Sequence, residues 1–215
     1  MSLLGRGLAA LLLIIPLLAC AQTAPQQFQE GTNYELVTPA QPTDSGTNVE
    51  VVELFWYGCP HCFHLEPTVT EWLKHKPSNV TFIRVPAVLG PNWGLLARAY
   101  FAAEDLGVLN KIHGPLFHAY HELHTPMNTD NDVIAFFVAQ GVAEADIRDA
   151  MNSFSVETKM RRARQMSENY RLTGVPTIIV NGKYRTNASM AGSTENIFKV
   201  VDFLIKKEIT AAHAK

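Results

Sequence analysis

The chain has 215 residues, of which 47% are apolar, and a formal net charge of −2. This length and apolar content predict one folded domain, or one domain with an inserted subdomain, and exclude a disordered chain. The nearly balanced charge gives no support to nucleic-acid binding, which usually requires a strong basic excess. We therefore expect a globular protein without a nucleic-acid partner.

The first 21 residues have the pattern of a secretory signal, with one positive charge, an apolar run and then small residues. The run is too short to span a membrane as a helix. Two cleavage sites compete: residues 17–20 match a bacterial lipobox, in which Cys20 would carry a lipid, whereas residues 19–21 match an ordinary site that would remove Cys20. Both predict export to an oxidising compartment, with residues 22–32 as a flexible tether.

The next segments predict a strand, a helix and a parallel strand. Residues 33–37 favour a short strand, and residues 49–57 form an apolar, β-branched run that is typical of a strand buried on both faces. Helical spacing of apolar residues follows over 59–76, and a further strand is predicted over 80–87. We therefore expect a right-handed parallel crossover.

The pattern then changes to successive helices, and strand signals return only at residues 176–186. There Asn181-Gly182 predicts a tight hairpin turn. A last helix is predicted over 193–208, with lysines in its final turn.

These elements predict one α/β domain that is interrupted by an all-helical insertion. The expected parts are the α/β domain at 33–91 and 173–208, the insertion at 92–172, and a loose tail at 209–215.

The cysteines Cys59 and Cys62 are the main functional signal. They close too small a loop to be a useful structural staple, and no second Cys-x-x-Cys pair is present to complete a tetrahedral zinc site. Pro60 suits the first position of a helix, which would place Cys59 at the N-cap, facing the amides of His61 and Cys62. The positive helix end should lower the pKa of Cys59, while Cys62 lies one turn deeper and shielded. A redox-active pair is therefore favoured, with an exposed sulfur and a shielded one.

Four histidines follow in the predicted insertion, but their spacing does not match a zinc-protease helix. We expect these histidines to form polar surface near the substrate-binding groove and to bind no metal. They are His113, His118, His121 and His124.

Two stretches, "VVELFWYGCPHC" and "TGVPTIIVNGKY", resemble the DsbA family of thiol:disulfide oxidoreductases. The resemblance extends over roughly residues 30–208 and rests on four matched elements. These are an acidic residue six positions before the first cysteine, the CPHC tetrapeptide, a Val-Pro after a long helix, and an NGKY hairpin. The family implies a thioredoxin fold that carries an inserted helical domain.

The resemblance also implies roles for individual residues. Val175-Pro176 would be a cis peptide beside the two sulfurs, and the backbone of Val175 would pair with an extended client; the alternative is a trans proline that merely opens the strand. Glu53 would be a buried acid that relays a proton to or from Cys62; the alternative is an ordinary lysine or water partner.

His61 would stabilise the Cys59 thiolate, or else face solvent with little influence. The resemblance also implies that the stabilised thiolate makes the disulfide form a strong oxidant, as in the DsbA family. The chain departs from the family in one respect. Relatives often have a lysine near the buried acid, whereas Phe82 and Arg84 occupy the corresponding strand here, so a carboxylate–lysine pair is not supported.

The function implied by the resemblance is donation of the Cys59–Cys62 disulfide to reduced, unfolded exported proteins in the bacterial periplasm. The protein would be a monomer without a cofactor other than this disulfide, and a DsbB-type membrane quinone reductase would reoxidise it. Two alternatives stay open. One is a disulfide isomerase or reductase on the same fold, although few residues are available for the N-terminal dimerisation module of DsbC-type isomerases. The other is a lipid-tethered, non-catalytic peptide-binding module.

Overall fold

The computed structural model describes residues 28–213. The signal sequence, Cys20 and the first part of the predicted tether lie outside the described residues. Among residues 28–213, no helix is both long enough and apolar enough to cross a bilayer.

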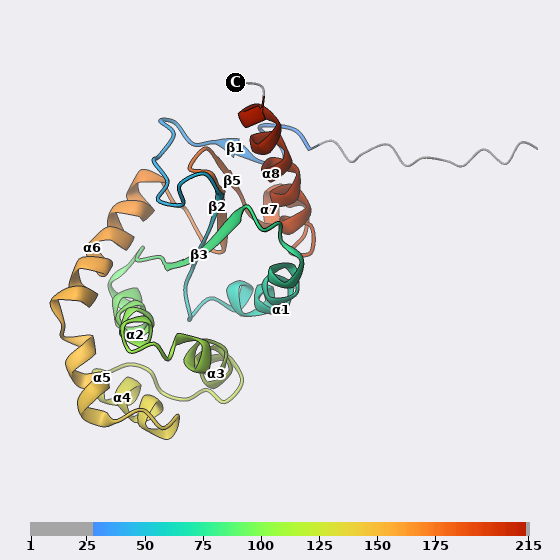
Figure 1. Ribbon diagram of the computed structural model, residues 1–215. Helices are drawn as coiled ribbons and strands as arrows, with labels where there is room; N and C mark the ends of the chain where they lie inside the picture. Colours follow the sequence, from blue (N-terminus) through green and yellow to red (C-terminus); the bar gives the residue numbers. More distant parts are fainter. Residues whose placement is uncertain (1–27, 214–215) are drawn as a thin grey trace, which may run out of the picture.

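A five-stranded mixed sheet forms the centre of the α/β part, with the order β1-β5-β4-β2-β3 (Figure 1). Strands β2 and β3 are parallel and are connected by α1, and the other neighbours are antiparallel. The apolar run predicted to be a buried strand is β2, and all seven of its residues are buried. The bounds are β1 (Glu35–Leu36), β2 (Val49–Phe55), α1 (Pro60–His75), β3 (Val80–Pro86), β4 (Thr177–Val180) and β5 (Tyr184–Thr186).

The two faces of the sheet carry two separate apolar cores, because successive strand residues point to opposite faces. Val51 and Ile178 pack with α1 and with α8 (Ile197–His213), whereas Val52 and Ile179 pack with the helical insertion. The insertion therefore packs against the face of the sheet that carries Val52 and Ile179, and Figure 1 shows α2 and α3 below the sheet and α6 along one side of the molecule.

The segment between β3 and β4 is helical throughout its regular elements, and local sequence explains where its helices begin. Thr129 caps α4 and forms a reciprocal capping box with Asp132. Ser153 caps α6 by accepting a hydrogen bond from the backbone N–H of Val156, without a reciprocal partner. The elements are η1 (Pro91–Trp93), α2 (Gly94–Asp105), α3 (Leu109–His121), α4 (Asp130–Ala139), α5 (Glu144–Met151) and α6 (Phe154–Asn169).

The predicted hairpin turn lies between β4 and β5. Asn181 and Gly182 both have positive φ, at 51° and 64°, which is the conformation expected of a two-residue Asn-Gly turn. The turn also touches a distant loop, because the backbone N–H of Gln41 donates to the carbonyl of Gly182 at 2.9 Å. A β-carbon at position 182 would come within 2.1 Å of the Gln41 carbonyl oxygen, so only glycine fits here.

Two expectations at the ends of the chain were wrong. The final helix does not stop at residue 208: α8 continues to His213, because Ile209 still packs against the core. The expected tether is part of the fold from residue 28 onward. Phe28 is buried with its ring edge-on to Phe203, and Glu30 forms a β-bridge with Tyr34. A short helix, α7 (Ala188–Ala191), follows β5.

Candidate active site

Cys59 stands at the junction of β2 and α1. After β2 ends, the backbone N–H of Cys59 donates to the carbonyl of Trp56 at 3.0 Å, which closes a tight turn. Cys59 is the N-cap residue in an extended conformation, and Pro60 begins the helix at a position where its missing N–H leaves no bond unmade. The local sequence therefore places the sulfur of Cys59 at the open end of α1.

The two cysteines are free thiols in this structure, and their environments differ. Cys62 is fully buried, and Cys59 is 8% exposed. The predicted order of exposure is present, although Cys59 is much more covered than the sequence suggested. One neighbour is Val175, whose carbonyl accepts a hydrogen bond from the Cys59 thiol at 3.4 Å.

The pKa values of the two thiols are shifted in opposite directions. A hydrogen bond from the Cys62 thiol is the main reason that the pKa of Cys59 falls to about 6; burial opposes it, and the backbone N–H groups of Cys62 and His61 and the charge of His61 add to it. No full cap hydrogen bond is formed by the Cys59 side chain, so the helix end acts through the nearby N–H dipoles. Burial raises the pKa of Cys62 far above its usual range.

The bond between Val175 and Pro176 is cis, as the resemblance implied. Val175 is half-buried and Pro176 is buried. A second cis bond, Thr38-Pro39, was not anticipated from the sequence. The thiol contact of Val175 brings the start of β4 next to the start of α1, although more than a hundred residues separate them.

Stacked tryptophans lie beside this junction. Trp56 and Trp93 stack with their centroids 4.3 Å apart and their planes 11° from parallel. A β-carbon at Gly58 would lie 2.4 Å from the Trp56 ring, so glycine is required between the tryptophan and Cys59. The helical insertion therefore contacts the segment that precedes the cysteines through Trp93.

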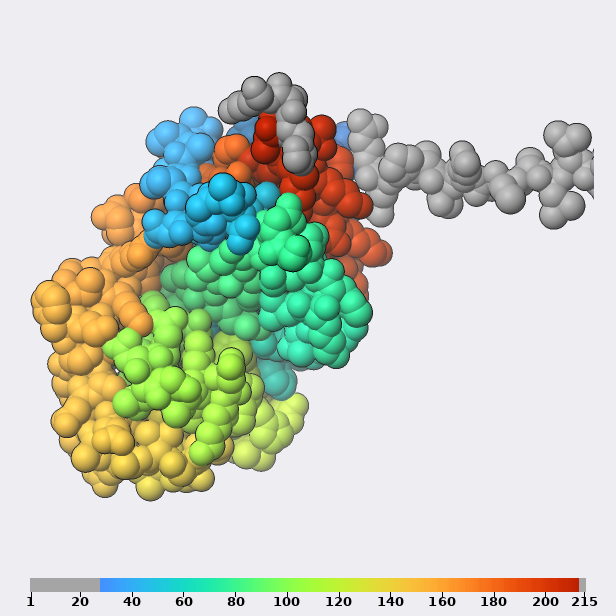
Figure 2. Space-filling model, viewed as in Figure 1, coloured from blue at the N-terminus to red at the C-terminus, as the bar shows by residue number. Residues whose placement is uncertain are grey.

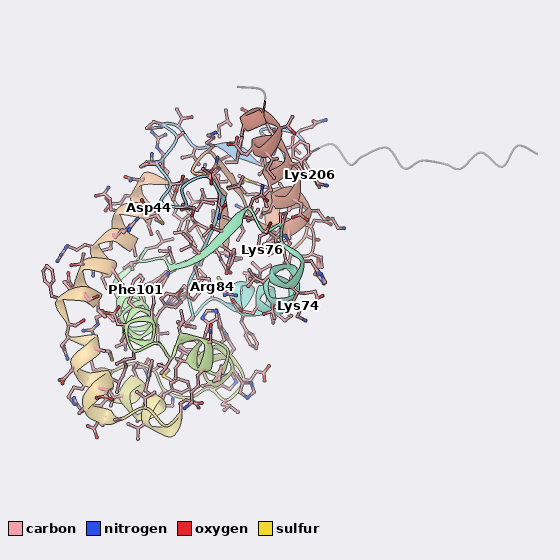
Figure 3. The ribbon with its side chains drawn as sticks, viewed as in Figure 1. Asp44, Lys74, Lys76, Arg84, Phe101 and Lys206 are labelled. Carbon is pink, nitrogen blue, oxygen red and sulfur yellow. The ribbon has the colours of Figure 1, made fainter. Side chains whose placement is uncertain are left out.

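Glu53 is fully buried in the middle of β2. The parallel register places it opposite Arg84 of β3, and the Arg84 Nε donates to Glu53 Oε2 at 3.1 Å. A lysine partner was not supported by the sequence, and an arginine supplies the cation instead. Figure 3 labels Arg84 at the centre of the molecule, between the sheet and the helices below it.

The pKa of Glu53 is raised to about 8, mainly because burial disfavours its charged form. The negative charge of Glu66 raises it further, and Arg84 lowers it. Glu53 Oε1 is buried without a hydrogen-bond partner. The carboxyl group lies close enough to Cys62 that its ionised form raises the pKa of that thiol.

Three further residues of the site were missed. Glu66 accepts from Arg84 Nη2 at 3.1 Å and lies 3.1 Å from His113 Nε2, while His113 Nδ1 lies 2.7 Å from the hydroxyl of Tyr57. His113 is buried, so the expectation that it forms polar surface was wrong. Only the position of Glu66 could have been suspected, because it lies four residues after Cys62 and so on the same face of α1.

A second histidine of α3 contacts the segment that precedes Cys59. His121 Nε2 donates to the backbone carbonyl of Tyr57 at 2.7 Å, and its ring stacks on Phe63. His118, in contrast, is exposed and pairs with Glu122. Within the described part of the chain, no group of three or more His, Cys, Asp and Glu side chains could hold a metal ion.

The fold agrees with comparisons to known proteins. The family profile "DSBA-like thioredoxin domain" matches residues 80–202. The thiol:disulfide interchange protein DsbA of Pseudomonas syringae pv. tomato is 37% identical over 207 residues, which cover 96% of this chain and 97% of the relative. DsbA of Pseudomonas aeruginosa is 36% identical over 205 residues, covering 95% of this chain and 97% of that one.

Solved structures give the same result. A crystal structure of Pseudomonas aeruginosa DsbA superposes with a TM-score of 0.83 at 36% identity, covering 86% of this chain and 97% of that chain. The DsbA of Xylella fastidiosa superposes with a TM-score of 0.78 at 32% identity, covering 83% and 96%. The predicted thioredoxin fold with a helical insertion is thus confirmed, and the chain belongs to the DsbA family.

Proposed function

We propose that this protein is a thiol:disulfide oxidoreductase that transfers the Cys59–Cys62 disulfide to other proteins. One observation carries the proposal: a thiol with a pKa of about 6 lies at a helix start, directly above a fully buried second thiol. A sulfur that is stable as a thiolate is a good leaving group, so the protein gives up its disulfide readily. Disulfide transfer is also what the names of the DsbA relatives describe.

In the first step a client thiolate attacks the sulfur of Cys59 in the disulfide form. The new bond joins the client sulfur to Cys59, the Cys59–Cys62 bond breaks, and its electron pair leaves on Cys62. Because the pKa of Cys62 is raised far above its usual range, this sulfur needs a proton. Glu53 is the nearby acid, with a pKa of about 8, that would supply it.

In the second step another client thiolate attacks the client sulfur of the mixed disulfide and expels Cys59. The client has then lost two electrons and gained a disulfide, and the protein holds Cys59 as a thiolate and Cys62 as a thiol. The neighbouring N–H groups and the charge of His61 favour this thiolate, which supports the proposed roles of Pro60 and His61 at the helix start.

The client would lie along Val175. This residue is half-buried, its carbonyl lies 3.4 Å from the Cys59 sulfur, and Pro176 fixes the backbone that follows it. An extended segment paired with this backbone would be held by main-chain hydrogen bonds, which do not depend on client sequence. That suits clients that share only an unfolded state and a reduced thiol.

The test is oxidation of a reduced peptide dithiol by the purified disulfide form under anaerobic conditions. We expect one peptide disulfide for each protein disulfide consumed. The Cys59→Ser variant should transfer none. Cys62→Ser that is treated with oxidised glutathione should form a lasting mixed disulfide at Cys59 and release one equivalent of reduced glutathione. If the wild-type disulfide form leaves the peptide reduced while Cys59 is intact, the proposal is wrong.

We propose that the protein works in the bacterial periplasm, where its signal sequence would deliver it, and that a DsbB-type membrane enzyme regenerates its disulfide by passing two electrons to quinone. Lipid attachment at Cys20 stays a prediction. The intact mass of the mature N-terminus distinguishes acylated Cys20 from a chain that begins after it.

A further inference from the structure

We propose that His113, on helix α3 of the insertion, is a positioning residue for the redox reaction: through Glu66 and Arg84 it keeps a proton on Glu53 beneath Cys62. The inference rests on the proposed function only for its kinetic consequence. It assigns a chemical task to the helical insertion, in addition to covering the sheet.

The geometry is an unbroken chain of polar contacts between five side chains from different elements. Glu53 of β2 contacts Arg84 of β3 at 3.1 Å, Arg84 contacts Glu66 of α1 at 3.1 Å, and Glu66 contacts His113 of α3 at 3.1 Å. The chain ends at Tyr57, whose hydroxyl lies 2.7 Å from His113 Nδ1. Tyr57 is two residues before Cys59, and Glu53 lies near Cys62. Both ends of this series of contacts therefore lie close to the cysteines.

The chemistry of these side chains determines which group donates and which accepts in each hydrogen bond of the series. A carboxylate can only accept, so His113 Nε2 carries the hydrogen that it shares with Glu66. Its Nδ1 is then free to accept from Tyr57, whose hydroxyl stays protonated because burial raises its pKa well above the usual range. With its hydrogen on Nε2, His113 satisfies both neighbours and donates to Glu66.

The charges explain why that hydrogen matters. Burial works against the charged form of Glu66, but the hydrogen bond from His113, together with the charge and hydrogen bond of Arg84, outweighs it and lowers the pKa. Glu66 is thus the carboxylate that neutralises Arg84. Glu53, buried beside an arginine that is already paired, keeps its proton.

Among the described residues, Glu53 and Glu66 are the two carboxylates that form ion pairs with Arg84. Tyr100 of α2 donates its hydroxyl to the Arg84 backbone carbonyl at 3.1 Å, and it carries no charge near neutral pH because burial raises its pKa. The titratable and charged groups around the two carboxylates are Tyr57, Cys62, Arg84, Tyr100 and His113.

Removing His113 should bring the pKa values of the two acids closer together. Without its donor, Glu66 would protonate more readily, and Arg84 would then offer its charge to Glu53. Glu53 would lose its proton at a lower pH and could no longer supply it to the leaving Cys62 sulfur. The defect would appear as a shifted pH profile, which a merely structural role of His113 would not produce.

The experiment measures the rate constant for oxidation of a reduced peptide dithiol by the disulfide form between pH 5 and 9, corrected for the thiolate fraction of the peptide. We expect the corrected wild-type rate to fall as Glu53 deprotonates, and Glu53→Gln to abolish this fall. In His113→Phe the fall should move to lower pH by about one unit. His113→Gln, which can still donate toward Glu66, should lie closer to the wild type.

Two further variants separate positioning from folding. His118→Gln changes an exposed histidine of the same helix and should superimpose on the wild type. Tyr57→Phe keeps the aromatic ring but removes the hydroxyl that contacts His113 Nδ1. The pH at which its corrected rate constant falls should also be lower than in the wild type, by less than in His113→Phe. Near-ultraviolet circular dichroism verifies that His113→Phe is folded. If the corrected rate constant of the folded variant falls at the same pH as that of the wild type, the inference is overturned.

A second readout does not depend on activity. The infrared carbonyl band of protonated Glu53, identified by its loss in Glu53→Gln, should disappear at lower pH in His113→Phe than in the wild type. A band that titrates identically in both proteins overturns the inference. If the wild type transfers no disulfide but the band still shifts, the proposed function fails and the link between His113 and Glu53 stands.

Discussion

Cys59 and Cys62 are the same amino acid three positions apart, and their environments give them opposite preferences. Cys59 lies at the helix end, where N–H dipoles and the Cys62 thiol favour its charge, so its pKa is about 6. Cys62 lies where no water can solvate a charge, so burial raises its pKa. This difference defines an attacked sulfur and a shielded sulfur before any client is bound.

The thiolate preference should make the stability of the reduced protein depend on pH. A group whose pKa is lower in the folded state contributes stability above its unfolded pKa, and this contribution is lost as pH falls through the folded value. With a shift from 9.0 to about 6, the contribution of Cys59 should be about 1 kcal/mol at pH 7 and about 4 kcal/mol above pH 9. Cys62 does not titrate in either state below about pH 8.

Urea unfolding of reduced wild type and reduced Cys59→Ser between pH 5.5 and 8 measures this contribution. We expect the difference in unfolding free energy to grow with pH above 6, because only the wild type releases the proton of Cys59 on folding. A difference that is constant over this range would show that Cys59 ionises like an ordinary cysteine.

Glu53 should act in the opposite sense. Its folded pKa of about 8 exceeds its usual 4.5, so the folded state holds the proton more tightly and stability falls as pH rises between these values. By pH 7 the loss is about 3 kcal/mol. Glu53→Gln keeps the shape and has no proton to lose, so the variant should be more stable than wild type at pH 7.

The measurement is urea unfolding of the oxidised proteins, in which Cys59 does not titrate, at pH 4.5 and pH 7. The advantage of Glu53→Gln should nearly vanish at pH 4.5. An equal advantage at both values would mean that the carboxyl group is not the source of the pH dependence.

Local sequence was sufficient to predict only part of the site. Cys59, Pro60 and Cys62 follow from helix-start chemistry, and Glu53 stands out as a charge within an apolar run. Glu66 and His113 could not be predicted, because their importance comes from strand register and from α3 packing onto α1. Glu66 and His113 are 47 residues apart in the sequence, and no local sequence pattern indicates a contact over that separation.

At the scale of elements, the β4–β5 hairpin is set by backbone geometry, and this can be tested at Gly182. Gly182→Ala meets two obstacles, a φ of 64° and a carbonyl oxygen 2.1 Å from the new carbon. Gly107→Ala is the matched control, because Gly107 has a φ of 68° with open space around it. We expect a loss of about 1 kcal/mol at Gly107 and roughly 3 kcal/mol or more at Gly182.

Thermal or urea unfolding of the two variants measures these losses, and the difference between them isolates the close approach of the Gln41 backbone. Equal losses at the two glycines would show that the loop that contains Gln41 moves aside without a cost in unfolding free energy.

Element types were easier to predict than element ends. The strand at 49–57 and the hairpin turn were correct in type because their residue patterns are local. Helix α8 was predicted to end at residue 208, because lysines usually mark a last turn, but the apolar contact of Ile209 extends it. Such ends depend on what a helix packs against, and a single sequence does not contain that.

At the scale of the whole molecule, the insertion and the sheet share one apolar core. Figure 2 shows the green to orange insertion in continuous contact with the blue and blue-green segments of the α/β part. Surface ion pairs join the same parts, such as Arg162 with Asp44. The shared core includes Val52, Leu54 and Ile179 from the sheet and Phe101, Phe117 and Met160 from the insertion.

A shared core predicts that the two parts unfold together, although the insertion interrupts the other part in sequence. Phe117 of α3 is 1% exposed and contacts the rings of Phe55 and Tyr57. Phe117→Ala should therefore cost about 3–5 kcal/mol of unfolding free energy in the whole molecule. Because the loss belongs to one cooperative unit, the amide protons of β2 and of α3 should lose hydrogen-exchange protection by the same amount.

Exposed Phe154 provides the matched control, because it is 81% exposed at the start of α6 and its replacement by alanine removes little packing. Phe154→Ala should leave the protection of both elements within about 0.5 kcal/mol of the wild type. If Phe117→Ala weakened α3 while β2 kept its full protection, the insertion would be a separately folding unit. Its contacts with the segment before Cys59 could then open without unfolding the sheet, and α3 could not hold the redox site in a fixed geometry.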